Sequence, residues 1–159
     1  MKSIEQVKIQ EVMKIATIHA GRIKDAMSDL QEIFPITQDK ILRLNKEEFL
    51  LIELLTNRFA KLQDFMGAKV FDAFFRVVGE DADRMTLIDK VNKLEKLRII
   101  ENADIWSDFR ELRNHLSHEY PDDPASTTKY LNEVYSLAPA LLKCLDSIKE
   151  RLEEYTNAS

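Results

Sequence analysis

Glycine and proline are scarce in this chain, whose 159 residues include three glycines and four prolines. A β-rich fold needs turn residues every several positions, so this scarcity argues against sandwiches and barrels. Hydrophobic residues make up 45% of the sequence and charged residues 32%, which is ordinary for a globular protein. The composition therefore predicts an all-α fold, and the length suits one domain, residues 1–159, with a substantial core.

Cysteine and long apolar runs are scarce as well. Cys144 is the single cysteine, so it cannot form a disulfide within the chain. Its place on an apolar helical stripe predicts a buried thiol rather than a nucleophile. The apolar runs are far too short to cross a bilayer, and no N-terminal segment has the layout of a signal peptide. We therefore expect a cytoplasmic protein without a membrane partner.

Excess positive charge is also missing, because the formal net charge is −5 at pH 7. Non-specific coating of nucleic acid requires many neutralised phosphates, which an acidic chain supplies poorly. A small basic site within an acidic body is still compatible with this charge, and an acidic protein also suits a basic partner.

Apolar residues recur at steps of three and four over most of the chain, which predicts an up-and-down bundle of about five helices, two of them long. Ser3 with Gln6, and Asn45 with Glu48, form capping-box patterns that mark two of the helix starts. The expected helices run from Ser3 to Phe34, from Asn45 to Gly79, across Ile88 to Leu97, from Asn102 to His118, and from Ser126 or Thr127 through Tyr155. Pro139 predicts a kink in the last helix.

Three residues within the expected helices are interpreted structurally. Gly21 and Gly67 lie inside helices, where glycine costs about 1 kcal/mol relative to alanine, and close helix–helix approach is the simplest explanation for both. His19 lies on the stripe of the first helix and is interpreted as a partly buried core histidine.

The stretch 112–121 holds the residues best suited to chemistry. It brings Arg113, Asn114, His115, His118 and Tyr120 to one helix end. These side chains can bind a phosphate and transfer protons near neutral pH. On a straight helix, the arginine and the second histidine point about 140° apart at 3.6 residues per turn. Joint action of Arg113 and His118 on one substrate therefore requires the helix to end at His118 or a second subunit to contribute.

Two other interpretations of this stretch follow from the residues alone. Arginine and histidine at a helix end often only satisfy carbonyls and nearby carboxylates, and composition favours this simpler explanation. A zinc site is the weaker option: it could draw on His115, His118, Glu119, Asp122 and Asp123, but the spacing is not the His-Glu-x-x-His pattern and Arg113 would oppose a cation. We expect neither a metal nor another cofactor.

The run Arg113-Asn114-His115-Leu116-Ser117-His118-Glu119-Tyr120 resembles the Arg-x-x-x-x-His-x-Tyr motif of the HEPN superfamily. The most similar branch is that of the HepT-like toxins of prokaryotic toxin–antitoxin pairs, also called nucleotidyltransferase substrate-binding proteins. A helix with tryptophan and phenylalanine before the motif and a long helix after the proline turn extend the likeness over most of the chain. Arg-x-x-x-x-His alone is a weak pattern, whereas the longer motif at a helix end is fairly specific.

The resemblance implies a homodimeric, metal-independent endoribonuclease toxin with its active cleft across the dimer. Arg113 would hold the scissile phosphate, and His118 would act as general acid or base while the RNA 2′-hydroxyl attacks. Asn114 would orient one of them. Tyr120 matches the tyrosine that a partner minimal nucleotidyltransferase, the antitoxin, can modify with AMP, and that anionic group would exclude substrate.

The motif also contains a second, overlapping frame, from Arg110 to His115. The frame from Arg113 to His118 is preferred because only it has asparagine after the arginine and continues to Tyr120, which leaves Arg110 and His115 as candidate substrate-binding residues. The alternative function is a non-catalytic, nucleotide-binding accessory subunit of a nucleotidyltransferase, and a plain helical interaction protein is a third possibility.

Overall fold

The computed structural model describes residues 3–117 and 123–158 of the chain, and every regular element in these ranges is helical, which confirms the all-α prediction. The elements are α1 (Ile4–Asp29), α2 (Gln38–Leu42), α3 (Lys46–Phe65), the π-helical turn η1 (Met66–Val70), α4 (Phe71–Val77), the 3₁₀ turn η2 (Ala82–Arg84), α5 (Leu87–Lys96), α6 (Ala103–Leu116) and α7 (Pro124–Ala158).

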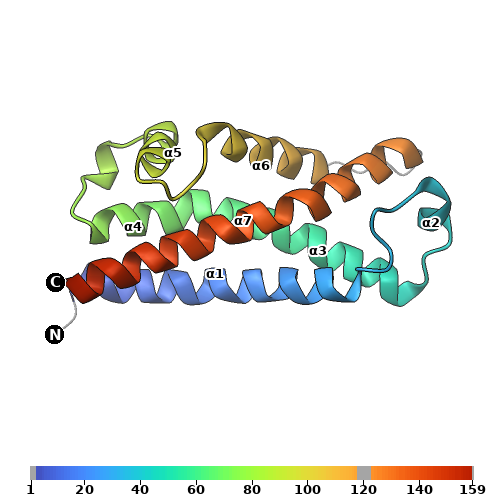
Figure 1. Ribbon diagram of the computed structural model, residues 1–159, viewed down its shortest axis with the longest axis horizontal. Coiled ribbons are helices and arrows are strands. Elements are labelled where there is room, and N and C mark those ends of the chain that lie inside the picture. The colour runs from blue at the N-terminus through green and yellow to red at the C-terminus, as the bar shows by residue number, and fades with distance from the viewer. Residues whose placement is uncertain (1–2, 118–122, 159) are drawn as a thin grey trace.

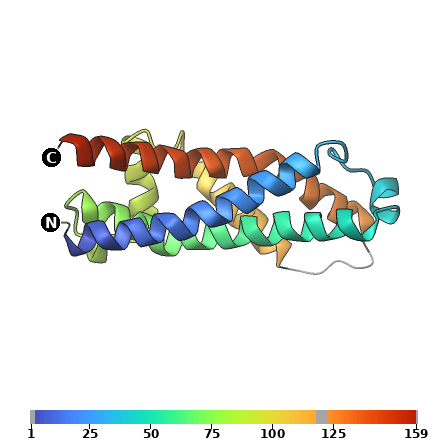
Figure 2. The same ribbon diagram turned by 90° about the horizontal axis from the view of Figure 1, so that it is seen from below.

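Three long helical runs lie lengthwise and form the body of the bundle (Figures 1 and 2). These runs are α1, the continuous α3–η1–α4, and α7. Helix α6 lies along the same body, while α5 runs across it. The described N- and C-terminal ends lie together at one end of the bundle, and α2 caps the other. The C-terminal end of α6 points toward the α2 end of the molecule.

The core is rich in phenylalanine. Among the largest fully buried side chains are Phe59, Phe71, Phe74, Phe75 and Phe109. Cys144 joins this core with 4% of its surface exposed, and burial raises the pKa of its thiol to about 12. The prediction of a buried, unreactive cysteine is therefore confirmed, because a thiol with so high a pKa is almost entirely protonated at neutral pH.

Several helix ends lie where the capping residues predicted them. Both capping boxes are present, with the Ser3 and Asn45 side chains each accepting a hydrogen bond from a backbone N–H in the first turn. Gly79 has a positive φ of 85°, and the N–H of Glu80 donates to the carbonyl of Phe75 at 2.9 Å, which is the Schellman arrangement expected at a helix C-terminus.

Other helix boundaries differ from the prediction. The first helix ends at Asp29 rather than at Phe34, because the chain after Leu30 continues in turns, and the unpredicted α2 follows. The last helix begins at Pro124 rather than at Ser126 or Thr127. Its start is capped by Asp123, whose carboxylate accepts from the Ser126 N–H at 3.1 Å. Proline suits the first helical position since its missing N–H would have no partner there.

The two helical glycines differ in their surroundings. A Cβ atom built on Gly67 would lie 3.2 Å from Cζ2 of Trp106, so α6 approaches η1 closely at this glycine, as predicted. A Cβ atom on Gly21 meets nothing within 4 Å. The predicted close contact at Gly21 is therefore wrong, and its glycine has no packing role among the described residues.

None of the described helices combines the length and the apolar character that crossing a membrane requires.

Candidate functional site

Helix α6 carries the motif on faces that are set by its buried stripe. Trp106, Phe109 and Leu112 face the core, each with 3% or less of its surface exposed. The Asn102 side chain caps the start by accepting from the Ile105 N–H at 3.0 Å. With the stripe fixed in the core, Arg113 and Asn114 turn toward α3 and its continuation η1.

Arg113 makes the strongest polar contact of this site. Its Nε donates to Oδ1 and Oδ2 of Asp64 on α3 at 2.9 and 3.1 Å, and its Nη2 donates to Oδ2 at 2.8 Å. The hydrogen bonds to Asp64 raise the pKa of Arg113 above its ordinary value, so the guanidinium is always charged. A bidentate pair of this kind fixes the orientation of the guanidinium as well as its charge.

A pocket of about 350 Å³ lies next to this ion pair and opens to solvent. Its wall includes Arg110, Arg113 and Asn114 from α6, opposite Asp64 and Gln63 from α3. Two guanidinium groups against one carboxylate leave a local charge of about +1 in an acidic protein. The pocket therefore suits a single anionic group better than a cation.

Gln63 and a π-helical turn give this pocket an unusual wall. The Gln63 side chain is 5% exposed and is the one buried polar residue among the described positions. The turn η1 follows directly after Phe65, and its Gly67 also lines the pocket. Single π turns insert an extra residue into an α-helix and occur often at functional sites. Here the turn coincides with the close approach of Trp106 to Gly67.

His115 lies on the other side of α6. Its ring stacks on Tyr130 of α7 with the centroids 4.4 Å apart, and its Nε2 is 3.9 Å from Oε1 of Glu111. These residues line a separate pocket of about 300 Å³ between α6 and α7, together with Asp108, Lys129 and Glu133. The structure therefore brings Arg110, Arg113 and Asn114 together and does not bring His115 to them. Two further predicted residues, His118 and Tyr120, lie outside the described residues.

Comparison with known proteins does not extend this description. No family model, no curated protein and no solved structure matches the chain. The HEPN resemblance thus stays a prediction from the motif, and the case for a function has to come from the site itself.

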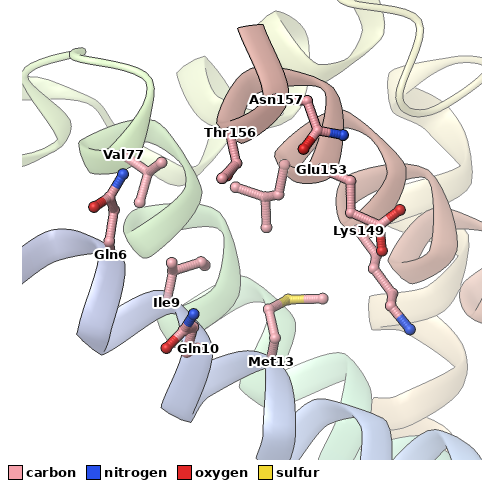
Figure 3. A pocket seen from close by; sticks show the side chains of 10 residues that line it. Gln6, Ile9, Gln10, Met13, Val77, Lys149, Glu153, Thr156 and Asn157 are labelled. Carbon is pink, nitrogen blue, oxygen red and sulfur yellow. The ribbon is translucent and has the colours of Figure 1, made fainter. Parts of the chain in front are cut away.

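A groove larger than these two pockets lies elsewhere among the described residues. A groove of about 520 Å³ runs between α1 and α7 at the end where the termini meet (Figure 3). Its floor is apolar, with Ile9 and Met13 of α1 and Val77 of α4, while Gln6 and Gln10 stand on one wall. Its lining contains no histidine and no arginine, and its charged side chains are Lys149 and Glu153.

Two residues of the site were missed by the sequence analysis. Asp64 and Gln63 are adjacent in α3, and both look like ordinary surface residues because a polar side chain beside an apolar stripe is common. No local pattern connects Asp64 with Arg113, which lies on a helix far along the chain. His19, in contrast, is partly buried as predicted, and its Nδ1 accepts a hydrogen bond from Nη1 of Arg58 at 3.0 Å.

No cluster of three or more metal-binding side chains occurs within residues 3–117 and 123–158. Of the five residues considered for zinc, only His115 and Asp123 lie in these ranges. His115 stacks on Tyr130, and Asp123 accepts from Ser126 through both carboxylate oxygens. Both are thus engaged in contacts that stabilise the two helices.

Proposed function

We propose that the chain is a metal-independent endoribonuclease of the HEPN type, a toxin of a toxin–antitoxin pair that acts on RNA as a homodimer. One observation carries the proposal: Arg113 is fixed by a bidentate ion pair with Asp64 at a pocket that it shares with Arg110 and Asn114. These are the motif residues to which phosphate binding and orientation are assigned. A pocket with a net positive charge on an acidic protein favours the binding of an anion, and the phosphate of an RNA backbone is such an anion.

In the proposed reaction, the pocket holds the scissile phosphate and spreads its developing charge over Arg113 and Arg110. The adjacent 2′-oxygen bonds to phosphorus and loses its proton, while the bond from phosphorus to the 5′-oxygen breaks and that oxygen gains a proton. The products are a 2′,3′-cyclic phosphate end and a 5′-hydroxyl end. His118 transfers one of these protons, and the arginines stabilise the charge without moving.

Asp64 acts in this scheme as a positioning residue. A free arginine has many rotamers, and its charge would be spread over a wide volume near the pocket. The carboxylate restricts the guanidinium to one orientation before substrate arrives, which lowers the cost of organising the transition state.

Regulation is proposed to act at Tyr120. A partner minimal nucleotidyltransferase would transfer AMP from ATP to the phenol oxygen and release pyrophosphate. The resulting phosphodiester carries a negative charge two residues from His118, where it would repel the RNA backbone.

One observation favours the alternative of a non-catalytic, nucleotide-binding accessory subunit. The bidentate pair occupies the Nε and Nη2 donors of Arg113, which are the donors that would otherwise face a phosphate. A protein that only binds a nucleotide weakly would need no more than Arg110 and the remaining donors of Arg113.

RNA cleavage in excess EDTA tests the two against each other. The purified protein, shown by mass to be unmodified, is compared with His118→Ala, Arg113→Ala and Lys24→Glu, the last being a control for an exposed charge on α1. We expect cleavage that the first two variants lose and the control keeps. Inactive wild type with intact helical structure supports the accessory subunit, and activity that survives both substitutions refutes the site.

A further inference from the structure

Helix α1 exposes an apolar stripe on its outer side. Ile15 and Ile18 are 44% and 51% exposed at the middle of the helix, and Val7 and Ile4 extend the stripe toward the N-terminus with 45% and 71% exposure. The buried side of α1 carries other residues, among them Ala16, Ala20 and Ile23. In Figure 1 the helix runs along the edge of the molecule with no element beyond it. The exposed Glu11 separates Val7 from Ile15, so Ile15 and Ile18 form the apolar centre of this face. Exposed apolar side chains grouped on an outer helix are a common mark of an interface.

Charges of opposite sign flank the two central isoleucines symmetrically. Glu11 lies one turn before Ile15, and Arg22 lies one turn after Ile18, both on the outer side of the helix. Both are exposed, and neither takes part in an ion pair within the described chain. Two unpaired opposite charges at equal distances from an apolar centre form a self-complementary pattern.

We propose that this face of α1 is a twofold contact between two copies of the chain, with the two α1 helices packed antiparallel. A twofold axis between Ile15 and Ile18 places Ile15 of one copy against the partner's Ile18. With a rise of 1.5 Å per residue, Glu11 and Arg22 each lie about 8 Å from that axis along the helix. Glu11 of each copy therefore lies opposite the partner's Arg22, and two equivalent ion pairs flank the apolar centre.

The charge order selects this arrangement over the parallel one. Parallel helices in register would set Glu11 against the partner's Glu11 and Arg22 against the partner's Arg22, which is repulsive. Self-pairing of one patch is also the rule for twofold dimers, since each contact occurs twice. One helix pair gives a small interface, so association should be weak and dependent on concentration.

This contact places the twofold axis on α1, away from the Arg113 pocket, and so differs from the dimer with its cleft at the motif that the HEPN resemblance implies. Helix α6 packs chiefly against α3, α5 and α7, so the Arg113 pocket does not lie on the outer face of α1. A dimer formed through α1 leaves both pockets accessible. The response of the oligomeric state to substitutions on α1 therefore tests this interface whether or not the chain cleaves RNA.

Sedimentation velocity over a concentration series provides the test. Wild type is expected to shift from the 18.5 kDa of one chain toward twice that mass as the concentration rises. Glu11→Arg and Arg22→Glu should each weaken the dimer about tenfold, because two ion pairs are lost and two repulsions are created. The double variant Glu11→Arg/Arg22→Glu should restore the wild-type dissociation constant. Lys24→Glu, on a different face of α1, is the matched control and should change nothing.

Ile18→Glu checks the apolar centre and should leave only the monomer, with a far-ultraviolet circular dichroism spectrum like that of wild type. A wild-type chain that stays monomeric throughout the series overturns the proposal. So does a dimer that resists both Ile18→Glu and the single charge reversals, because it must then use another surface.

Discussion

Alanine at the two helical glycines should have opposite effects on stability, although the chemical change is the same. In exposed helical positions, glycine costs about 1 kcal/mol relative to alanine. Gly21→Ala should recover most of this, since its new methyl group meets nothing within 4 Å. Gly67→Ala gains the same propensity but places the methyl 3.2 Å from Trp106, closer than ordinary contact.

The size of the second effect depends on whether Trp106 can move. The indole is 3% exposed and is held between Phe71 and Phe109, with ring centroids 4.7 and 5.8 Å away. A ring packed on both sides yields little, and overpacking in a core costs about 1–3 kcal/mol. The net result for Gly67→Ala should be a loss of about 1 kcal/mol, so the two variants should differ by about 2 kcal/mol.

Urea unfolding followed by circular dichroism measures both variants, and thermal melts should place them several degrees apart, at about 2–4 °C per kcal/mol for a chain of this size. Trp106 is the only tryptophan, so fluorescence reports directly on the contact. Gly67→Ala should change the native emission, while Gly21→Ala should leave it unchanged. Equal stabilisation by both substitutions, with equal emission spectra, would refute the argument that Gly67 is required by the approach of α6.

Three further outcomes follow from the structure. Asp64→Asn should weaken the hold on Arg113 and lower RNA cleavage by about tenfold or more, but should cost no more than about 1 kcal/mol in urea unfolding, because the pair is partly exposed; a stability loss without any change in cleavage would remove Asp64 from the site. The Cys144 thiol should resist a thiol reagent at pH 8 in the native state and react at once in urea, since burial raises its pKa to about 12; rapid native labelling would contradict this. Burial, followed by the charges of Arg58 and Lys61, lowers the pKa of His19 below its ordinary value of 6.5. The unfolded chain then binds the proton more readily, so this contribution to stability is present above pH 6.5 and is lost as the pH falls through and below it, and His19→Gln should flatten that part of the stability–pH curve.

The sequence analysis predicted best where the physics is local. Capping boxes at Ser3 and Asn45 and the helix end at Gly79 depend on a few neighbouring residues, and all three are confirmed. The end of the first helix was missed because the apolar steps continue through Ile33 and Phe34, although the backbone there already turns. Periodicity records which residues are buried, and a turn can bury apolar residues at helical spacing.

The two glycines also show that a local sequence pattern does not reveal contacts with distant helices. The local sequence makes Gly21 and Gly67 equivalent, as glycines in the interior of expected helices. Whether a neighbour fills the space above a glycine depends on helices distant in the sequence, and only Gly67 has such a neighbour in Trp106. The prediction was therefore right for one position and wrong for the other.

The candidate site also has features that the sequence predicts and features that it does not. The sequence analysis grouped Arg110 and His115 as candidate substrate-binding residues, but the structure separates them into pockets on opposite sides of α6, as their five-residue spacing on a helix requires. Helical geometry does not predict the role of Asp64, because its pairing with Arg113 is set by the packing of α6 on α3.

The pairing of Arg113 with Asp64 changes the chemistry expected of the motif. A phosphate entering the pocket meets an arginine that is already neutralised in part, so it must bind through Arg110 and the free edge of Arg113 or displace the carboxylate. The first route keeps Arg113 oriented and favours catalysis, whereas displacement of the carboxylate favours simple binding. Asp64→Asn distinguishes the two routes. It should reduce RNA cleavage if the phosphate binds beside the ion pair, and it should tighten RNA binding without reducing cleavage if the phosphate displaces the carboxylate.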